Sequence, residues 1–149
     1  MKLSFLHRSE TLEFFSASTE TELSLPLIGD GIHAGFPSPA EDFVDISIDL
    51  NKELIKNPSA TFFAKVKGNS MMDAGINDGD LIIIDKSMEP SDGKIAVCFI
   101  DGEFTIKRIK IDRDCCWLVP ANNDFNPIRV TEENDFLVWG IVVHVIRSL

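Results

Sequence analysis

The chain has few of the residues that build most recognisable functional sites. Its 149 residues include three cysteines, three histidines and no tyrosine, and 14 Lys and Arg stand against 24 Asp and Glu, for a formal charge of −10 at pH 7. It has no cluster of basic residues to neutralise phosphates, so we expect no direct binding of nucleic acid. Any connection with DNA would then run through a protein partner.

The cysteines fit neither a disulfide framework nor a metal site. Cys115 and Cys116 are adjacent, and Cys98 lies in an apolar run. Their odd number and their spacing argue against disulfides and against zinc, and we expect no cofactor. Nowhere do about 18 apolar residues follow one another, and the N-terminus lacks the apolar core of a signal peptide. We therefore expect a cytoplasmic protein without membrane association.

Composition divides the chain near residue 34. Residues 10–22 are rich in Ser, Thr and Glu without a periodic apolar face, so residues 1–34 are predicted to form a flexible N-terminal arm, too short for a second domain. Residues 29–39 contain three glycines and two prolines, which favours an exposed loop. Within this loop the small residues Ala34 and Gly35 would make a good protease substrate.

Residues 35–149 have the pattern of one mainly β domain. Asp101 and Gly102 predict a tight hairpin turn between two strands, and Asp49 is a candidate N-cap for a short helix over 49–57 that ends at Pro58. Further short strands are predicted from apolar runs and alternation at 62–66, 81–84, 95–100, 103–111, 116–119 and 136–146. Many short strands separated by turn residues indicate a β-dominated fold.

Two residues far apart in the chain suggest a catalytic pair. Ser70 lies in a Gly-Asn-Ser-Met segment and would need a base, but His7 and His33 lie in the predicted arm and His144 in the last strand. A lysine can take the place of histidine if burial keeps it neutral near pH 7. In a strand over 103–111, Lys107 would be the only charge on a mostly apolar face. The ordinary alternative is a serine in a glycine-containing turn and a lysine that snorkels from a strand edge.

Several blocks of the sequence carry motifs, namely residues 34–40, 68–71 with 75–81, 101–108, and 119–122 with 139–145. These blocks resemble, in family order, the LexA/UmuD family of Ser–Lys peptidases. The separation of Ser70 and Lys107 is also similar to that of the family. LexA-like repressors carry an N-terminal helix-turn-helix domain, which the acidic first 34 residues cannot supply, so the chain resembles the UmuD-like members more closely.

The resemblance implies a LexA/UmuD-type β fold and a self-cleaving protein of the SOS response. Ser70 would attack the bond between Ala34 and Gly35, Lys107 would act as base, and the backbone N–H groups of Asn69 and Ser70 would stabilise the oxyanion. RecA filaments would stimulate the cut, and the truncated product would serve a UmuC-like Y-family translesion polymerase. UmuD-like proteins are homodimers, and the arm would cover the body until cleavage releases it.

Two departures from the family pattern and two alternative functions accompany this prediction. The arm is longer than usual for the family, and Ala34 stands where a UmuD-like protein is expected to have Cys. The chain could instead be a non-catalytic dimeric interaction module for polymerase and RecA, or a LexA-like phage or stress regulator without a DNA-binding domain. A signal-peptidase-like enzyme is disfavoured because no membrane anchor is evident.

Overall fold

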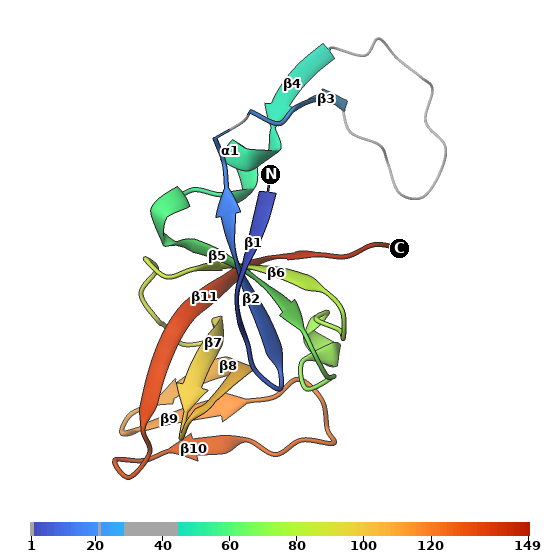
Figure 1. Ribbon diagram of the computed structural model, residues 1–149. Coiled ribbons are helices and arrows are strands. Elements are labelled where there is room, and N and C mark those ends of the chain that lie inside the picture. The colour runs from blue at the N-terminus through green and yellow to red at the C-terminus, as the bar shows by residue number, and fades with distance from the viewer. Residues whose placement is uncertain (1, 21, 29–44) are drawn as a thin grey trace.

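A nine-stranded antiparallel sheet dominates the structure, a computed structural model that describes residues 2–20, 22–28 and 45–149 (Figure 1). Its strands are β1 (Lys2–Arg8), β2 (Leu12–Ser18), β5 (Thr61–Val66), β6 (Leu81–Asp85), β7 (Ile95–Ile100), β8 (Glu103–Asp112), β9 (Cys115–Val119), β10 (Ile128–Val130) and β11 (Phe136–Ile146). They lie in the order β1-β2-β5-β6-β11-β7-β8-β9-β10. The prediction of a mainly β fold is confirmed.

The longest strand, β11, joins the two halves of this sheet. Its first part pairs with β7 and its second part with β6. The main core cluster combines buried side chains of β2, β5 and β6 with Val97 of β7 and Ile106 of β8. Because both halves contribute to one core, the sheet wraps around its own apolar interior.

Gly140 allows β11 to pass close to β6. A Cβ atom at this position would lie 2.5 Å from Cγ2 of Ile84, which is closer than two carbon atoms can approach without displacement. The pairing of β11 with β7 also shifts register between Val138 and Gly140. A β-bulge of this kind bends a strand and increases its twist, which suits a strand that crosses from one half of the sheet to the other.

The hairpin of β7 and β8 follows the sequence prediction closely. Asp101 (φ 47°) and Gly102 (φ 88°) both have the left-handed backbone of a tight two-residue turn. The turn pairs Ile100 with Glu103, and this register places Lys107 opposite Ala96. The turn thereby determines which residue of β8 reaches the interior.

The helices are short. α1 (Leu50–Leu54) begins after Asp49, whose carboxylate accepts a hydrogen bond from the N–H of Asn51, as predicted for an N-cap. Two 3₁₀ turns, η1 (Pro58–Ala60) and η2 (Met72–Ala74), complete the set. In the residues that the structure describes, no helix is long and apolar enough to cross a membrane.

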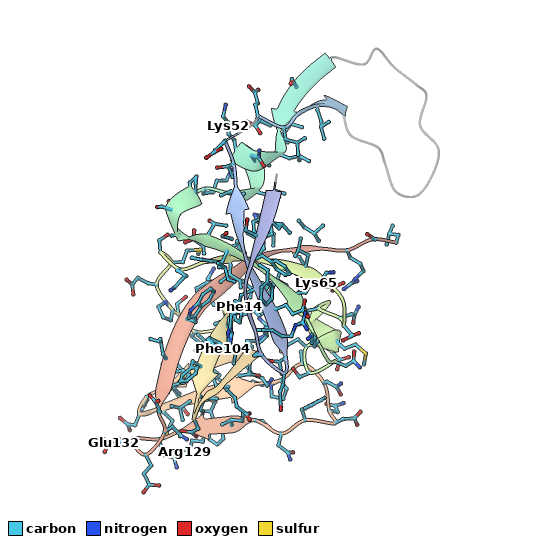
Figure 2. The ribbon with its side chains drawn as sticks, in the orientation of Figure 1. Phe14, Lys52, Lys65, Phe104, Arg129 and Glu132 are labelled. Atoms are coloured by element: carbon cyan, nitrogen blue, oxygen red, sulfur yellow. The ribbon has the colours of Figure 1, made fainter. Side chains whose placement is uncertain are left out.

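The N-terminal region differs from the expected flexible arm. Residues 2–18 form the hairpin of β1 and β2, and β2 pairs with β5 at the edge of the sheet. Leu12 and Phe14 are buried in the main core, where Phe14 packs against Phe104 (Figure 2). Local sequence does not reveal this burial, because residues 10–22 are rich in Ser, Thr and Glu and only Leu12 and Phe14 alternate as buried apolar residues. The surface that buries them is supplied by β5, a strand far along the chain.

A separate two-stranded ribbon consists of β3 (Ser24–Ile28) and β4 (Asp45–Asp49). β3 pairs with β4 along its whole length, and Figure 1 shows this ribbon reaching away from the large sheet. Leu25 of β3 is exposed. The predicted cleavage pair, Ala34 and Gly35, lies between these strands and outside the described residues.

Candidate functional site

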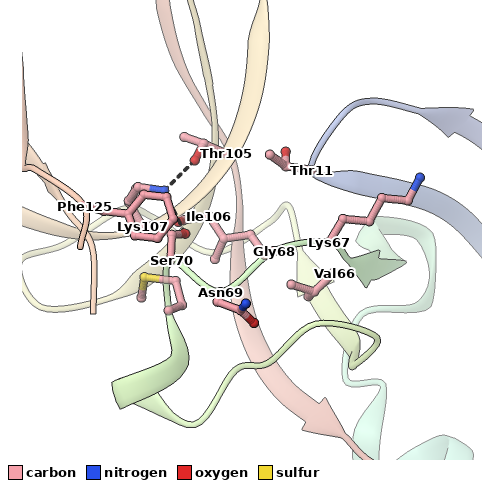
Figure 3. Close-up of a pocket in the computed structure, with 11 residues that line it drawn as sticks. Thr11, Val66, Lys67, Gly68, Asn69, Ser70, Thr105, Ile106, Lys107 and Phe125 are labelled. Carbon is pink, nitrogen blue, oxygen red and sulfur yellow. Dashed lines mark hydrogen bonds between the residues drawn. The ribbon is translucent and has the colours of Figure 1, made fainter. Parts of the chain in front are cut away.

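A cavity of about 230 Å³ opens beside the core and contains both members of the predicted pair (Figure 3). One wall is the segment that follows β5, with Ser70 at its end. The opposite wall is residues 105–107 of β8. Thr11, from the tip of the N-terminal hairpin, and Phe125 complete the lining. The cavity is an open groove next to a serine and a lysine, as a peptide substrate would require.

Lys107 lines this groove, where the pairing of β8 with β7 places it opposite Ala96. Its side chain is only 6% exposed. The Nζ atom lies 3.0 Å from Oγ of Ser70, 2.7 Å from Oγ1 of Thr105 and 3.0 Å from the carbonyl oxygen of Ile106. Each of these three partners is a neutral oxygen.

Burial lowers the pKa of Lys107 from its ordinary value, because the charged ammonium loses its hydration in the apolar interior. A thiolate at Cys98 would oppose this shift, but burial raises the pKa of the Cys98 thiol to about 12, so this group stays neutral. The neutral amine has two N–H donors and one lone pair. Thr105 and Ile106 can accept the two N–H bonds, which leaves the lone pair for the hydroxyl of Ser70.

The turn that carries Ser70 is held by residues from distant parts of the chain. Gly68 has a φ of 93°, a left-handed backbone conformation that glycine adopts without strain. The N–H of Gly68 donates to Oδ1 of Asp78 over 2.8 Å. The N–H of Ala121 donates to the carbonyl of Ser70, and Nδ2 of Asn122 donates to the carbonyl of Asn69 over 2.9 Å.

The bonds from Ala121 and Asn122 occupy the carbonyl groups of Ser70 and Asn69, not the N–H groups of these two residues. Within the described residues, no hydrogen bond uses the backbone N–H of Asn69 or of Ser70. Both residues line the cavity. Unpaired N–H groups beside a nucleophile are what an oxyanion-stabilising site needs.

The structure thus brings Ser70, Lys107 and Asn69 together and leaves other candidates elsewhere. His7 packs against the rings of Phe14 and Phe104, and His144 pairs with Ile83 in the sheet. His33, Ala34 and Gly35 lie outside the described residues. Among the described residues, no group of three His, Cys, Asp or Glu side chains could hold a metal ion.

Sequence reasoning missed the residues that support the pair. These residues are Thr105, which lies in the predicted strand over 103–111, and Ala121 and Asn122, which lie in one of the resembling blocks. The Pro-Ala-Asn run after an apolar strand was a usable signal, since a polar side chain at a strand end often has a partner elsewhere. Thr11 had no local signal, because its place depends on the pairing of β2 with β5.

Comparison with known proteins identifies the family of the chain. The Peptidase S24-like family matches residues 26–143. Protein MucA of Salmonella typhimurium is 38% identical over 132 residues, which cover 88% of this chain and 90% of MucA. Protein ImpA of the same species is 41% identical over 122 residues, covering 82% of this chain and 83% of ImpA.

A repressor is similar over the same region. The LexA repressor of Acidithiobacillus ferrooxidans is 41% identical over 133 residues, which cover 87% of this chain and 64% of the repressor. These matches confirm the resemblance that the sequence motifs indicated. The chain therefore belongs to the Peptidase S24-like family of serine peptidases and is one of its UmuD-like members.

Proposed function

We propose that this chain is a self-cleaving serine peptidase of the SOS response, in which Ser70 attacks the peptide bond between Ala34 and Gly35 and Lys107 is the general base. The observation that carries the proposal is the 3.0 Å contact between a buried lysine amine and a serine hydroxyl. Burial is essential to it, since only a lysine of lowered pKa can accept a proton near neutral pH.

In the first half of the reaction, the amine of Lys107 takes the hydroxyl proton of Ser70 while Oγ bonds to the carbonyl carbon of Ala34. The N–H groups of Asn69 and Ser70 stabilise the negative oxygen of the tetrahedral intermediate. Lys107 then gives its proton to the nitrogen of Gly35, and the C–N bond breaks. An ester between Ser70 and Ala34 remains.

In the second half, water attacks this ester and gives a proton to Lys107. The bond from the carbonyl carbon to Oγ breaks, and the proton returns to Ser70. One amine therefore serves as base and then acid in both halves, as in other acyl transfers. The products are residues 1–34 with a free carboxylate and residues 35–149 with a free amine.

The UmuD-like membership supports the proposed cellular role. RecA filaments stimulate the cut, and the chain acts as a cytoplasmic homodimer that supplies a UmuC-like Y-family polymerase. The formal charge of −10 favours protein partners over direct contact with DNA. The exposed side chains of Leu137 and Val145 on β11 offer apolar surface for a protein interface.

The direct test is a time course of the purified protein between neutral pH and about pH 10, with and without RecA filaments on single-stranded DNA, read by mass spectrometry and N-terminal sequencing. We expect a fragment that begins at Gly35. Ser70→Ala should remain intact, whereas Ser91→Ala, a change at an exposed serine, should cleave normally. An intact native chain after days with RecA would favour the non-catalytic interaction module instead.

A further inference from the structure

The bond between Ala34 and Gly35 separates strands that the fold pairs with one another. β1, β2 and β3 precede this bond, and β4 to β11 follow it. The ladder between β2 and β5 and the ladder between β3 and β4 therefore both connect the two products of a cut.

We propose that the hairpin of β1 and β2 stays bound to the body after cleavage, so that the product is a nicked two-chain protein rather than a body without its N-terminus. The inference rests on cleavage at Ala34 and concerns what becomes of residues 1–34. It replaces the expectation that the whole N-terminal segment is released.

Backbone pairing is the first reason for retention. β2 pairs with β5 from Leu12 opposite Val66 to Ser16 opposite Phe62. The N–H of Lys67 extends this ladder by donating to the carbonyl of Thr11 over 2.8 Å. Departure of the hairpin would leave β5 as an edge strand with unpaired backbone groups.

Core packing is the second reason. Leu12 is 0% and Phe14 3% exposed, and both belong to the main core cluster. The ring of Phe14 lies 4.8 Å from that of Phe104 and 4.9 Å from that of Trp139. Loss of the hairpin would expose the rings of Phe104 and Trp139 and the neighbouring core side chains to water, and this cost disfavours release.

Polar contacts at the tip of the hairpin join it to the active-site walls. The hydroxyl of Thr11 donates to the carbonyl of Phe104, just before the stretch of β8 that carries Lys107. Glu13 of β2 lies 3.0 Å from Nζ of Lys67, in the segment that follows β5. Thr11 also lines the groove, so a retained hairpin would keep the site complete after the cut.

The ribbon of β3 and β4 provides a second link across the bond. Beyond the ladder itself, the N–H of Leu50 donates to the carbonyl of Leu23 over 2.9 Å. The Peptidase S24-like match begins at residue 26, so the β1–β2 hairpin lies outside the region shared with the family model. Family membership therefore does not determine the fate of this hairpin.

The test should cut the chain independently of its own chemistry. In full-length Ser70→Ala, the recognition sequence of a site-specific protease is placed at Ala34, and the protein is nicked and passed through a size-exclusion column at about 1 µM. We expect both polypeptides to elute together, which requires a dissociation constant below that concentration. An N-terminal peptide that elutes alone would overturn the proposal.

A pair of variants connects retention to the contacts described. In the nicked protein, Phe14→Ala should release the N-terminal peptide, whereas Leu6→Ala, which truncates a 50% exposed side chain, should not. Circular dichroism of each variant before nicking checks its fold. If Phe14→Ala does not fold, hydrogen exchange of the β2 amides in the nicked parent decides instead. Protection equal to that of the uncut chain is the expected result, and its loss would contradict retention.

Failure of this proposal is distinguishable from failure of the proposed function. If the native chain never yields a fragment beginning at Gly35, the self-cleavage assignment is wrong, but the nicked Ser70→Ala protein still reports on retention. If the native chain cuts itself and residues 1–34 then separate under native conditions, the peptidase assignment stands and the retained hairpin is wrong.

Discussion

Lys107 and Ser70 meet at one point but are held there in different ways. Lys107 projects from β8, which pairs with β7 from Glu103 to Arg108, so the sheet register and the surrounding core determine its position. Ser70 lies in a turn outside the ladders, held through single hydrogen bonds from Ala121 and Asn122 to the turn carbonyls. The proposed base, Lys107, should therefore respond to changes in burial and charge, and the proposed nucleophile, Ser70, to the loss of individual hydrogen bonds.

The largest effect on the cleavage rate is expected from a change in the protonation of Lys107. In the native chain the cleavage rate should rise from neutral pH towards about pH 10, because the lowered pKa of Lys107 means that more amine is deprotonated as the pH rises. Lys107→Ala and Lys107→Arg should both abolish cleavage at every pH, since a guanidinium stays charged. Lys110→Arg, at an exposed position of β8, is the control. A native rate that is flat with pH would contradict the role of Lys107.

A smaller loss is expected from loosening the turn. Asn122→Ala removes the bond to the carbonyl of Asn69, and displacement of a nucleophile by about 1 Å can lower a rate by roughly 100-fold. Unfolding by urea should change little, because Asn122 is not a core residue. Asn123→Ala, an exposed neighbour, should cleave like the native chain. Equal rates for the two variants would show that this hydrogen bond does not position Ser70.

The hydrogen bond between Nζ of Lys107 and Oγ1 of Thr105 can be tested by substitution of Thr105. Thr105→Val keeps the shape of the side chain but removes the oxygen that accepts from Nζ of Lys107. We expect a fall of about 10-fold in the maximal rate from lost orientation. That oxygen favours the charged amine, so its loss should lower the pKa of Lys107 further and move the rise in rate to lower pH. Thr105→Ser should retain the native profile, and a native profile in Thr105→Val would contradict the assigned contact.

The smallest expected effect is on the free energy of unfolding, through the buried amine of Lys107. The pKa of Lys107 is lower in the folded chain than in the unfolded chain. At a pH between these two pKa values the unfolded state therefore binds more protons than the folded state. The free energy of unfolding then decreases as the pH falls from the unfolded-state pKa to the folded-state pKa. Lys107→Met should remove this cost, which is about 1.4 kcal/mol for each unit of pKa difference. Urea unfolding at pH 7 and pH 10 should show a gain for Lys107→Met that is larger at pH 7.

The features that local sequence determines were the ones that could be predicted. The bounds of β7 and β11 match the predicted runs, and the hairpin turn at Asp101 requires no knowledge of distant residues. The pairing of Ser70 with Lys107 could be predicted because a glycine-containing turn and a lone lysine on an apolar strand face each have a local signature. The pairing of β8 with β7 accounts for the position of Lys107 but not for that of Ser70.

The features that depend on distant partners could not be predicted. Leu12 and Phe14 enter the core only because β5 offers a free edge to β2. β10 is a three-residue strand defined by its pairing with β9, and its own sequence has too few residues for a pattern. The bonds from Ala121 and Asn122 to the Ser70 turn join segments far apart in the chain, which no local period reveals.

The neutral surroundings of Lys107 have a consequence for the conditions under which the site can work. Among the described residues its amine forms hydrogen bonds with uncharged oxygens alone, and burial rather than a neighbouring cation lowers its pKa. Mobile ions screen charges that face water and have little access to a buried group. The fraction of Lys107 amine that is neutral should therefore depend on pH and hardly on ionic strength, so that a change in salt concentration alone should leave the cleavage rate unchanged.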